Sequence, residues 1–312
     1  MASIPVILCL LSFIAVGFCK PLGCPHTEDL FPCSCKRFAV GLRVVCADFN
    51  TSNHLTRAFR ILRDYRVHTV LLHALYINET LPNDLFDGLQ INEIKVEKSK
   101  LRFPQPAFTG LDSSLYVLNV AEKSLIKSQE RFALAKLSKL HELYVQSNKL
   151  EKVEDKWLNE KVPNVETLVL DSNDISELEE HAFANLASLK KISLSDNRIK
   201  IVKRSMFPDP APYLIRIDLS FNEIHSLPEN FFTNIESLRD IVLSGNELKT
   251  LPMNTWIGVW RKLSTVLLFD NPLDCDEKIE WMKKYPKPYN LDGNCVLPKS
   301  MSGRSIRTIF NT

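Results

Sequence analysis

The chain has 312 residues, and its 39 Lys and Arg residues nearly balance its 37 Asp and Glu residues. The two signs are interspersed, so the sequence lacks the basic stripe of a dedicated nucleic-acid-binding protein. It also lacks the phosphate-binding glycine-rich loop, the H-E-x-x-H metal motif and the G-x-S-x-G nucleophile motif. The sequence therefore predicts no catalytic residue, no cofactor, no metal site and no nucleic-acid partner.

The first segment, residues 1–19, is apolar and carries no charged side chain before Lys20. It is too short and too Pro-interrupted for a membrane helix, which needs about 20 apolar residues. Small residues at Ala15, Gly17 and Cys19 provide cleavage sites. We interpret 1–19 as a secretory signal peptide. No second long apolar run follows, so the sequence predicts a secreted, extracellular protein without a membrane span.

Removal of this segment leaves six cysteines: Cys24, Cys33, Cys35, Cys46, Cys275 and Cys295. An even number in an exported chain predicts disulfides. The first four allow three pairings. A zinc site is the competing interpretation, but their C-x8-C-x-C-x10-C spacing lacks the paired ligand hooks of structural zinc sites. Asn50 and Asn78 each begin an Asn-x-Ser/Thr motif and are predicted glycosylation sites.

From residue 67 the chain repeats one pattern, L-x-x-L-x-L-x-x-N-x-L, at intervals of 24 or 25 residues. The nine units start at Val67, Ile91, Leu115, Leu140, Val165, Leu189, Leu214, Leu238 and Leu263. A second ladder follows later in the units: Phe86, Phe108, Phe132, Trp157, Phe183, Phe207, Phe232 and Trp256. Such a period is typical of leucine-rich repeats. It predicts one curved α/β solenoid with parallel strands on its concave face and short helical or irregular turns outside.

An asparagine occupies the ninth position of six units: Asn148, Asn173, Asn197, Asn222, Asn246 and Asn271. The chain turns inward after each strand, and its buried backbone groups there need partners. An Asn side chain offers one acceptor and two donors, so we predict a structural ladder and no catalytic role. The first three units have Leu75, Ser99 and Lys123 instead. The N-terminal third is therefore predicted to be less regular.

With its repeats and cysteine-rich ends, the sequence resembles the extracellular leucine-rich repeat family. Residues 20–46 look like the N-terminal cap of that family, residues 275–312 look like its C-terminal cap, and residues 47–274 would form the solenoid. The resemblance implies the pairs Cys24–Cys35 and Cys33–Cys46. The second C-cap cysteine of the family is Glu277 here, which leaves one C-cap pair, Cys275–Cys295.

The start "CPHTEDLFPCSC" is also similar to a group of secreted arthropod proteins. Its named member is the non-catalytic subunit of oplophorus-luciferin 2-monooxygenase. This resemblance implies association with a small secreted protein.

Binding residues are expected at the variable strand positions, because side chains on a strand alternate between faces and the fixed positions build the core. The N-terminal half of this face is acidic (Glu93, Glu97, Glu122, Glu142), partly offset by Lys95 and Lys98, and the later half is basic (Lys190, Lys191, Arg216, Arg239), partly offset by Asp218 and Asp240. Ordinary solvated surface is the alternative interpretation. The predicted partner-binding residues are Tyr116, Glu142, Tyr144, Val169, Lys191, Arg216, Asp218, Arg239 and Asp240, and Val242 is a further expected apolar contact.

The C-terminal segment 278–312 carries seven basic residues against two acidic ones and could bind a glycan or glycosaminoglycan. The preferred hypothesis is a secreted, non-enzymatic protein that binds a protein partner through its concave face, for example as a stabilising non-catalytic subunit. Extracellular-matrix or innate-immune recognition of proteins or glycans is the alternative, and an enzyme is the least favoured reading.

Overall fold

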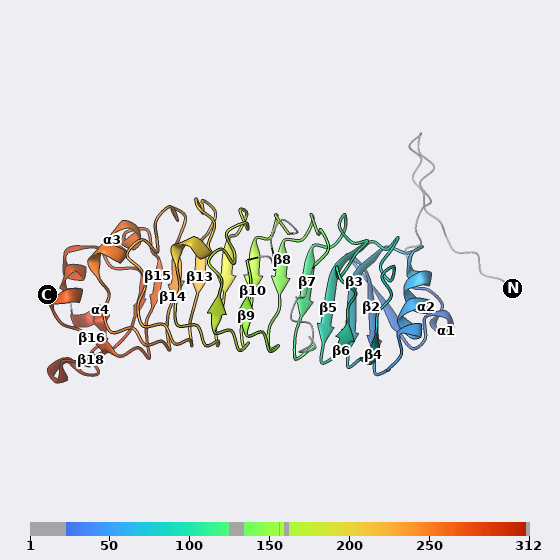
Figure 1. Ribbon diagram of the computed structural model, residues 1–312, viewed down its shortest axis with the longest axis horizontal. Coiled ribbons are helices and arrows are strands. Elements are labelled where there is room, and N and C mark those ends of the chain that lie inside the picture. Colours follow the sequence, from blue (N-terminus) through green and yellow to red (C-terminus); the bar gives the residue numbers. More distant parts are fainter. Residues whose placement is uncertain (1–22, 125–133, 156, 159–161, 310–312) are drawn as a thin grey trace.

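The computed structural model describes residues 23–124, 134–155, 157–158 and 162–309. It is an elongated stack of coils, each of which contributes one strand to a 12-stranded sheet (Figure 1). The predicted signal peptide, residues 1–19, lies outside the described residues, as does Phe132 of the aromatic ladder.

Each of the nine predicted units supplies one strand of this sheet. The strands are β3 (Val67–His73), β5 (Ile91–Glu97), β7 (Val117–Val120), β8 (Glu142–Tyr144), β10 (Thr167–Val169), β12 (Lys191–Ser193), β13 (Arg216–Asp218), β14 (Asp240–Val242) and β15 (Thr265–Leu267). All neighbours among them are parallel, and third positions pair with third positions, as Thr167 does with Glu142 and Lys191. The predicted α/β solenoid is confirmed.

The sheet also continues into both end segments. At the N-terminal end, β1 (Ser34–Phe38) and β2 (Gly41–Ala47) form an antiparallel hairpin, and β2 pairs parallel with β3. At the other end, β17 (Asn290–Asp292) pairs parallel with β15. These cap strands close the sheet, and neither carries the repeat pattern that revealed the other strands.

The side opposite the sheet consists of turns, short helices and small strand pairs. The helices are α1 (Thr27–Leu30), α2 (Ser52–Leu62), η1 (Arg204–Met206), α3 (Met253–Trp260), η2 (Glu277–Lys284), η3 (Lys299–Met301) and α4 (Ile306–Ile309). The strand pairs are β4 (Tyr76–Thr80) with β6 (Lys100–Arg102), β9 (Lys152–Val153) with β11 (Glu177–Leu178), and β16 (Leu273–Asp274) with β18 (Cys295–Leu297).

The core runs along the whole stack between the sheet and these turns. The aliphatic residues at the first, fourth and sixth positions of each unit are buried, as Val165, Leu168 and Leu170 are. Most of the aromatic ladder is buried behind them, and its rings touch from coil to coil; the Phe183 and Phe207 centroids lie 6.0 Å apart. Since burial of one such side chain stabilises by roughly 1.5–3 kcal/mol, the repetition itself supplies the folding energy.

Three disulfides fasten the two ends: Cys24–Cys35, Cys33–Cys46 and Cys275–Cys295. All four N-terminal cysteines are used in this way, so the zinc interpretation is wrong. The C-terminal cap is joined to the core by Trp281, whose Nε1 donates to the Leu251 carbonyl at 2.8 Å.

The six asparagines are buried at the turns and bond the backbone of their own and adjacent coils. Asn197 is representative: its Nδ2 donates to the Leu194 carbonyl at 3.0 Å and to the Leu170 carbonyl of the preceding coil at 3.1 Å. Its Oδ1 accepts from the Ile175 N–H at 3.1 Å. One side chain thus pairs backbone groups of two coils.

At the N-terminal end, serine hydroxyls replace the asparagine side-chain amides as hydrogen-bond partners of the turn backbone. Ser99 Oγ accepts from the Leu75 N–H at 3.1 Å, and Ser124 Oγ accepts from the Ser99 N–H at 3.2 Å. The repeat spacing put Lys123 at this ladder position, and this assignment is wrong. Both Glu122 (φ 55°) and Lys123 (φ 62°) are left-handed, so the turn contains one extra residue and Ser124 occupies the ladder site.

Candidate interaction surface

The exposed face of the 12-stranded sheet, called the concave face below, carries all nine predicted partner-binding residues on or beside its strands. At its N-terminal half, Tyr116 is 42% exposed, and its ring stacks on His141 with centroids 4.2 Å apart. The Tyr144 hydroxyl donates to Glu142 Oε2 at 2.7 Å. Burial, together with this hydrogen bond to a carboxylate, raises the pKa of Tyr144 to about 12.

The acidic side chains of this half are compensated within the chain. Lys95 Nζ lies 3.0 Å from Glu93 Oε1, and the Thr69 hydroxyl donates to Glu93 Oε2 at 2.8 Å. Burial alone would raise the pKa of Glu93, but the hydrogen bonds from Lys95 and Thr69 outweigh it and leave that pKa below its usual value. Lys98 pairs with Glu122 at 3.6 Å. Of the four predicted acidic side chains, Glu93 and Glu122 thus pair with lysines. Glu97 lies beside His73 and Glu142 accepts from Tyr144, so the acidic patch is only partly neutralised.

In the central part of the face, Lys191 and Arg216 are aligned on adjacent strands, as the repeat register requires. Lys191 is exposed, whereas Arg216 Nη2 lies 3.0 Å from Asp218 Oδ2. Val169 is half-buried two residues along β10 from Thr167, the strand partner of Lys191. This region therefore combines an exposed lysine, Lys191, with an arginine, Arg216, that a neighbouring carboxylate holds in place.

Two aspartates beside these cations are joined to serines. Asp171 Oδ1 accepts from the Ser193 hydroxyl at 2.6 Å, and Asp218 Oδ1 accepts from the Ser220 hydroxyl at 2.6 Å. The hydroxyls of Ser220 and Ser195 lie 2.9 Å apart and connect the two groups. Burial raises the pKa of Asp171, the hydrogen bonds it accepts oppose this, and the charge of Asp218 reinforces it.

Toward the C-terminal end, Arg239 is exposed and its Nη1 donates to the Leu238 carbonyl at 2.9 Å, while Asp240 is half-buried on β14. Val242 is buried, with 5% exposed, so its assignment as an exposed contact is wrong. Its strand partners are Asp218 and Leu267, whose longer side chains flank it on both sides.

Sequence reasoning also missed how the charge is distributed in this half of the face. At the second and third positions of the units, where each strand begins, the side chains include Lys190, Lys191, Arg216 and Arg239. At the fifth to eighth positions, where each strand ends, the side chains include Asp171, Asp196, Asp218, Phe221, Phe269 and Asp270. In this half of the face, the charge therefore also changes along each strand, from mostly basic where the strands begin to acidic where they end, in addition to the predicted change along the solenoid.

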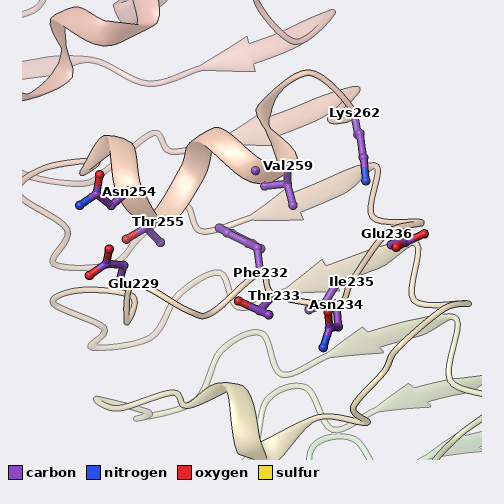
Figure 2. Close-up of a pocket in the computed structure, with 11 residues that line it drawn as sticks. Glu229, Phe232, Thr233, Asn234, Ile235, Glu236, Asn254, Thr255, Val259 and Lys262 are labelled. Atoms are coloured by element: carbon purple, nitrogen blue, oxygen red, sulfur yellow. The ribbon is translucent and has the colours of Figure 1, made fainter.

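The described part of the molecule also has two pockets of similar size. One, of about 260 Å³, lies between α3 and the turn at 229–236, away from the sheet (Figure 2). Figure 2 shows Glu229 at one end of it and Glu236 and Lys262 at the other, so its charged groups are of mixed sign and do not converge on one ligand position. The other, also about 260 Å³, opens beside the N-terminal hairpin between Phe38, Val40 and Glu93, where Glu93 is already bonded to Lys95 and Thr69.

The remaining predicted sites lie outside the concave face. Asn50 and Asn78 are both exposed, and their segments adjoin, because the Tyr76 N–H donates to the Phe49 carbonyl at 3.2 Å. The basic side chains of the C-terminal cap are exposed except for Lys287, which is half-buried. Lys287 Nζ donates to the Arg307 carbonyl at 3.0 Å.

Among the described residues, no group of three or more His, Cys, Asp and Glu side chains is arranged to hold a metal ion. His73, which shares this face with Glu97, has its Nδ1 3.7 Å from Glu97 Oε2. In the same described part of the chain, no helix has the length and apolarity needed to cross a bilayer.

The sequence profile of the family described as leucine-rich repeat matches residues 138–199, 163–209 and 212–273. No curated protein matches the chain. Solved structures of other proteins share its fold, including two complexes. A chain in the crystal structure of a TLR13–ssRNA13 complex has a TM-score of 0.59 and 20% identity, with 72% of this chain and 35% of that chain covered. This chain thus corresponds to about a third of that one.

The second structure is the octameric complex of Latrophilin 3 (Lec, Olf), Unc5D (Ig, Ig2, TSP1) and FLRT2 (LRR). One of its chains has a TM-score of 0.59 and 22% identity, with 84% of this chain and 87% of that chain covered. Together with the repeat register and the profile match, these likenesses show that the chain has the leucine-rich repeat fold.

Proposed function

We propose that this chain is a secreted, non-enzymatic binding protein that presents its concave face to a protein partner. The observation that carries the proposal is the contrast between the two sides of the strands. Fixed aliphatic positions are buried, whereas the variable positions form a continuous, chemically diverse surface that includes Tyr116, Lys191 and Arg239. Aromatic and Arg side chains on such a surface favour protein interfaces.

Two further features support extracellular binding. The three disulfides suit an oxidising compartment, which agrees with a signal peptide over residues 1–19. The two similar structures named above are described as complexes, one with RNA and one with other proteins. Because fold does not determine function, these likenesses support binding in general and not a particular ligand.

The role of a stabilising subunit follows from the arthropod resemblance of the N-terminal segment. In that role the chain would hold a smaller secreted protein against its concave face. The proposed test is affinity capture from the source fluid with wild-type protein and a Lys191→Glu/Arg216→Glu double variant. If the two cations are paired in the complex, their reversal weakens capture of the main partner by several-fold to hundreds-fold.

The matched control is Lys278→Glu/Lys284→Glu, which reverses two exposed charges on the C-terminal cap. Circular dichroism and melting temperature establish that both double variants are folded. Equal capture by wild type and the Lys191/Arg216 variant, with loss in the cap variant, would move the binding site to the cap.

The alternative function is recognition of an extracellular polyanion by the C-terminal cap. Its exposed basic side chains, Lys278, Lys283, Lys284, Lys299, Arg304 and Arg307, support it. Heparin affinity chromatography distinguishes this alternative, because retention that is lost in Lys278→Glu/Lys284→Glu would favour the cap.

We further propose that nucleic acid is not the ligand, because acidic side chains such as Glu166, Asp218 and Asp240 are interspersed with the basic ones on the concave face and would repel phosphates. Filter binding with a single-stranded RNA oligonucleotide tests this directly. Tight, salt-dependent retention at physiological salt would contradict it.

We also propose N-glycans at Asn50 and Asn78, whose exposed side chains allow modification without unfolding. A mobility shift on enzymatic deglycosylation that disappears in Asn50→Gln/Asn78→Gln would support this.

A further inference from the structure

The edge where strands β10 to β15 end carries an aromatic and acidic stripe that the core does not require. We define this exit stripe as Asp171, Asp196, Asp218, Phe221, Phe269 and Asp270. We propose that the exit stripe is the docking surface for a cationic, apolar polypeptide segment of the partner. This inference rests on the proposed function, since it specifies the chemistry of the partner on the same face.

Phe221 is the central observation. Its side chain is 50% exposed, so it contributes little burial to the core. Its backbone is left-handed, with φ of 53°, a conformation that is unfavourable for a bulky side chain. Most other coils have a small or polar residue at this eighth position, such as Ser172, Asp196 or Gly245. A phenylalanine here therefore gives no evident benefit to the fold.

The coils beside Phe221 make room for its ring. A Cβ at Gly245 would lie 2.5 Å from Phe221 Cδ1, so the ring packs against the Gly245 backbone. The Phe269 ring approaches from the coil after that of Gly245, with the Phe221 and Phe269 centroids 6.4 Å apart and their ring planes at 66°. The two rings thus reach toward each other across Gly245 and form an apolar platform over three coils.

Acidic side chains surround this platform. Asp196 and Asp270 are exposed at the eighth positions, and Asp218 lies on the strand that leads to Phe221. From β10 to β15, none of the seventh and eighth positions is basic; they are Asp171, Ser172, Ser195, Asp196, Ser220, Phe221, Ser244, Gly245, Phe269 and Asp270. The platform therefore favours a ligand with positive charge beside its apolar groups, by charge complementarity and by cation–π contact with the rings.

The dimensions favour an extended peptide. The stripe crosses five coils, and with strands about 4.8 Å apart it is roughly 19 Å long. An extended chain of about six residues covers that length. An oligosaccharide could stack on the rings, but it would not use the aspartates as counter-charges.

The test is a random seven-residue peptide display library screened against the full chain. The expected result is enrichment of peptides that combine Lys or Arg with aromatic or aliphatic residues. Affinities of the enriched peptides are then measured by fluorescence polarisation for wild type, Phe221→Asn and Asp196→Asn/Asp270→Asn. Asparagine tolerates the left-handed conformation, so these variants should melt no lower than wild type.

Phe221→Asn and Asp196→Asn/Asp270→Asn are each expected to weaken peptide binding by about ten-fold or more, the effect of removing an interface hot spot. Tyr289→Asn is the matched control, because it removes an aromatic ring that is 88% exposed on the C-terminal cap. No enrichment, enrichment of acidic peptides, or unchanged affinity in Phe221→Asn would overturn the inference. If Lys191→Glu/Arg216→Glu abolishes partner capture while Phe221→Asn leaves it intact, the proposed function stands and this inference alone fails.

Discussion

Replacement of Asn197 by alanine isolates the role of the asparagine ladder in holding the coils together. The side chain forms hydrogen bonds with two coils, but its bonds differ in consequence. The Leu170 carbonyl also accepts from Asn173 Nδ2 at 2.8 Å, and the Leu194 carbonyl also accepts from Asn222 Nδ2 at 2.9 Å. Both carbonyls therefore keep a partner when Asn197 is truncated.

The Ile175 N–H, by contrast, loses its hydrogen-bond acceptor when Asn197 is truncated. It donates to Asn197 Oδ1 at 3.1 Å, and Ile175 is fully buried. A buried donor without a partner costs about 1–3 kcal/mol, and the lost donor bonds of Nδ2 add to this. With about 2–4 °C in melting temperature per kcal/mol for a domain of 150–250 residues, and somewhat less for a longer chain, we expect Asn197→Ala to melt several degrees lower.

The matched control is Lys200→Ala in the same turn. Lys200 Nζ pairs with Glu223 at 3.3 Å, but Lys200 is exposed and Glu223 is only half-buried, so the pair contributes at most about 1 kcal/mol. Melting followed by circular dichroism under non-reducing conditions makes the comparison. If the two variants have the same melting temperature, the asparagine ladder does not stabilise the turns as its hydrogen bonds indicate.

Two further predictions concern stability. Cys275 is expected to be fully oxidised to Cys295, and Cys275→Ser/Cys295→Ser to lose roughly 3 kcal/mol of unfolding free energy; free Cys275 in a non-reducing peptide map would contradict this. Burial raises the pKa of Asp171, so the folded state binds its proton more tightly than the unfolded state, and stability falls as pH rises from the unfolded value through the folded one. The free energy of unfolding of Asp171→Asn, measured in urea, should rise relative to that of wild type between pH 4 and pH 7. A relative fall over that interval would contradict a raised pKa for Asp171.

Much of the fold follows from the sequence because the repeat encodes it locally. The fourth- and sixth-position aliphatic residues recur in every unit, so one correct alignment places nine strands and their register at once. The cap strands β2 and β17 could not be found in this way. They are held by pairing to a neighbouring strand and by disulfides, which leave no periodic signal.

The candidate site was less accessible to sequence reasoning for two physical reasons. The sequence indicates that Lys95 and Asp218 partly offset the charges around them, but which side chains pair, and at what distance, depends on side-chain geometry. Phe221 was missed because binding residues were expected only at the alternating, outward-facing strand positions, and the eighth position is not one of them. Its left-handed backbone and its packing on Gly245, which turn it toward solvent, are tertiary features.

Side-chain footprinting of the chain alone and in complex with its captured partner tests the central claim most directly. Hydroxyl radicals modify exposed aromatic rings, and the surface carries such rings both on the concave face (Tyr116, Phe221) and on the C-terminal cap (Tyr289). We predict that complex formation protects Tyr116 or Phe221, or both, and leaves Tyr289 as reactive as before. Protection confined to Tyr289, with both concave-face rings unchanged, would contradict binding through the concave face.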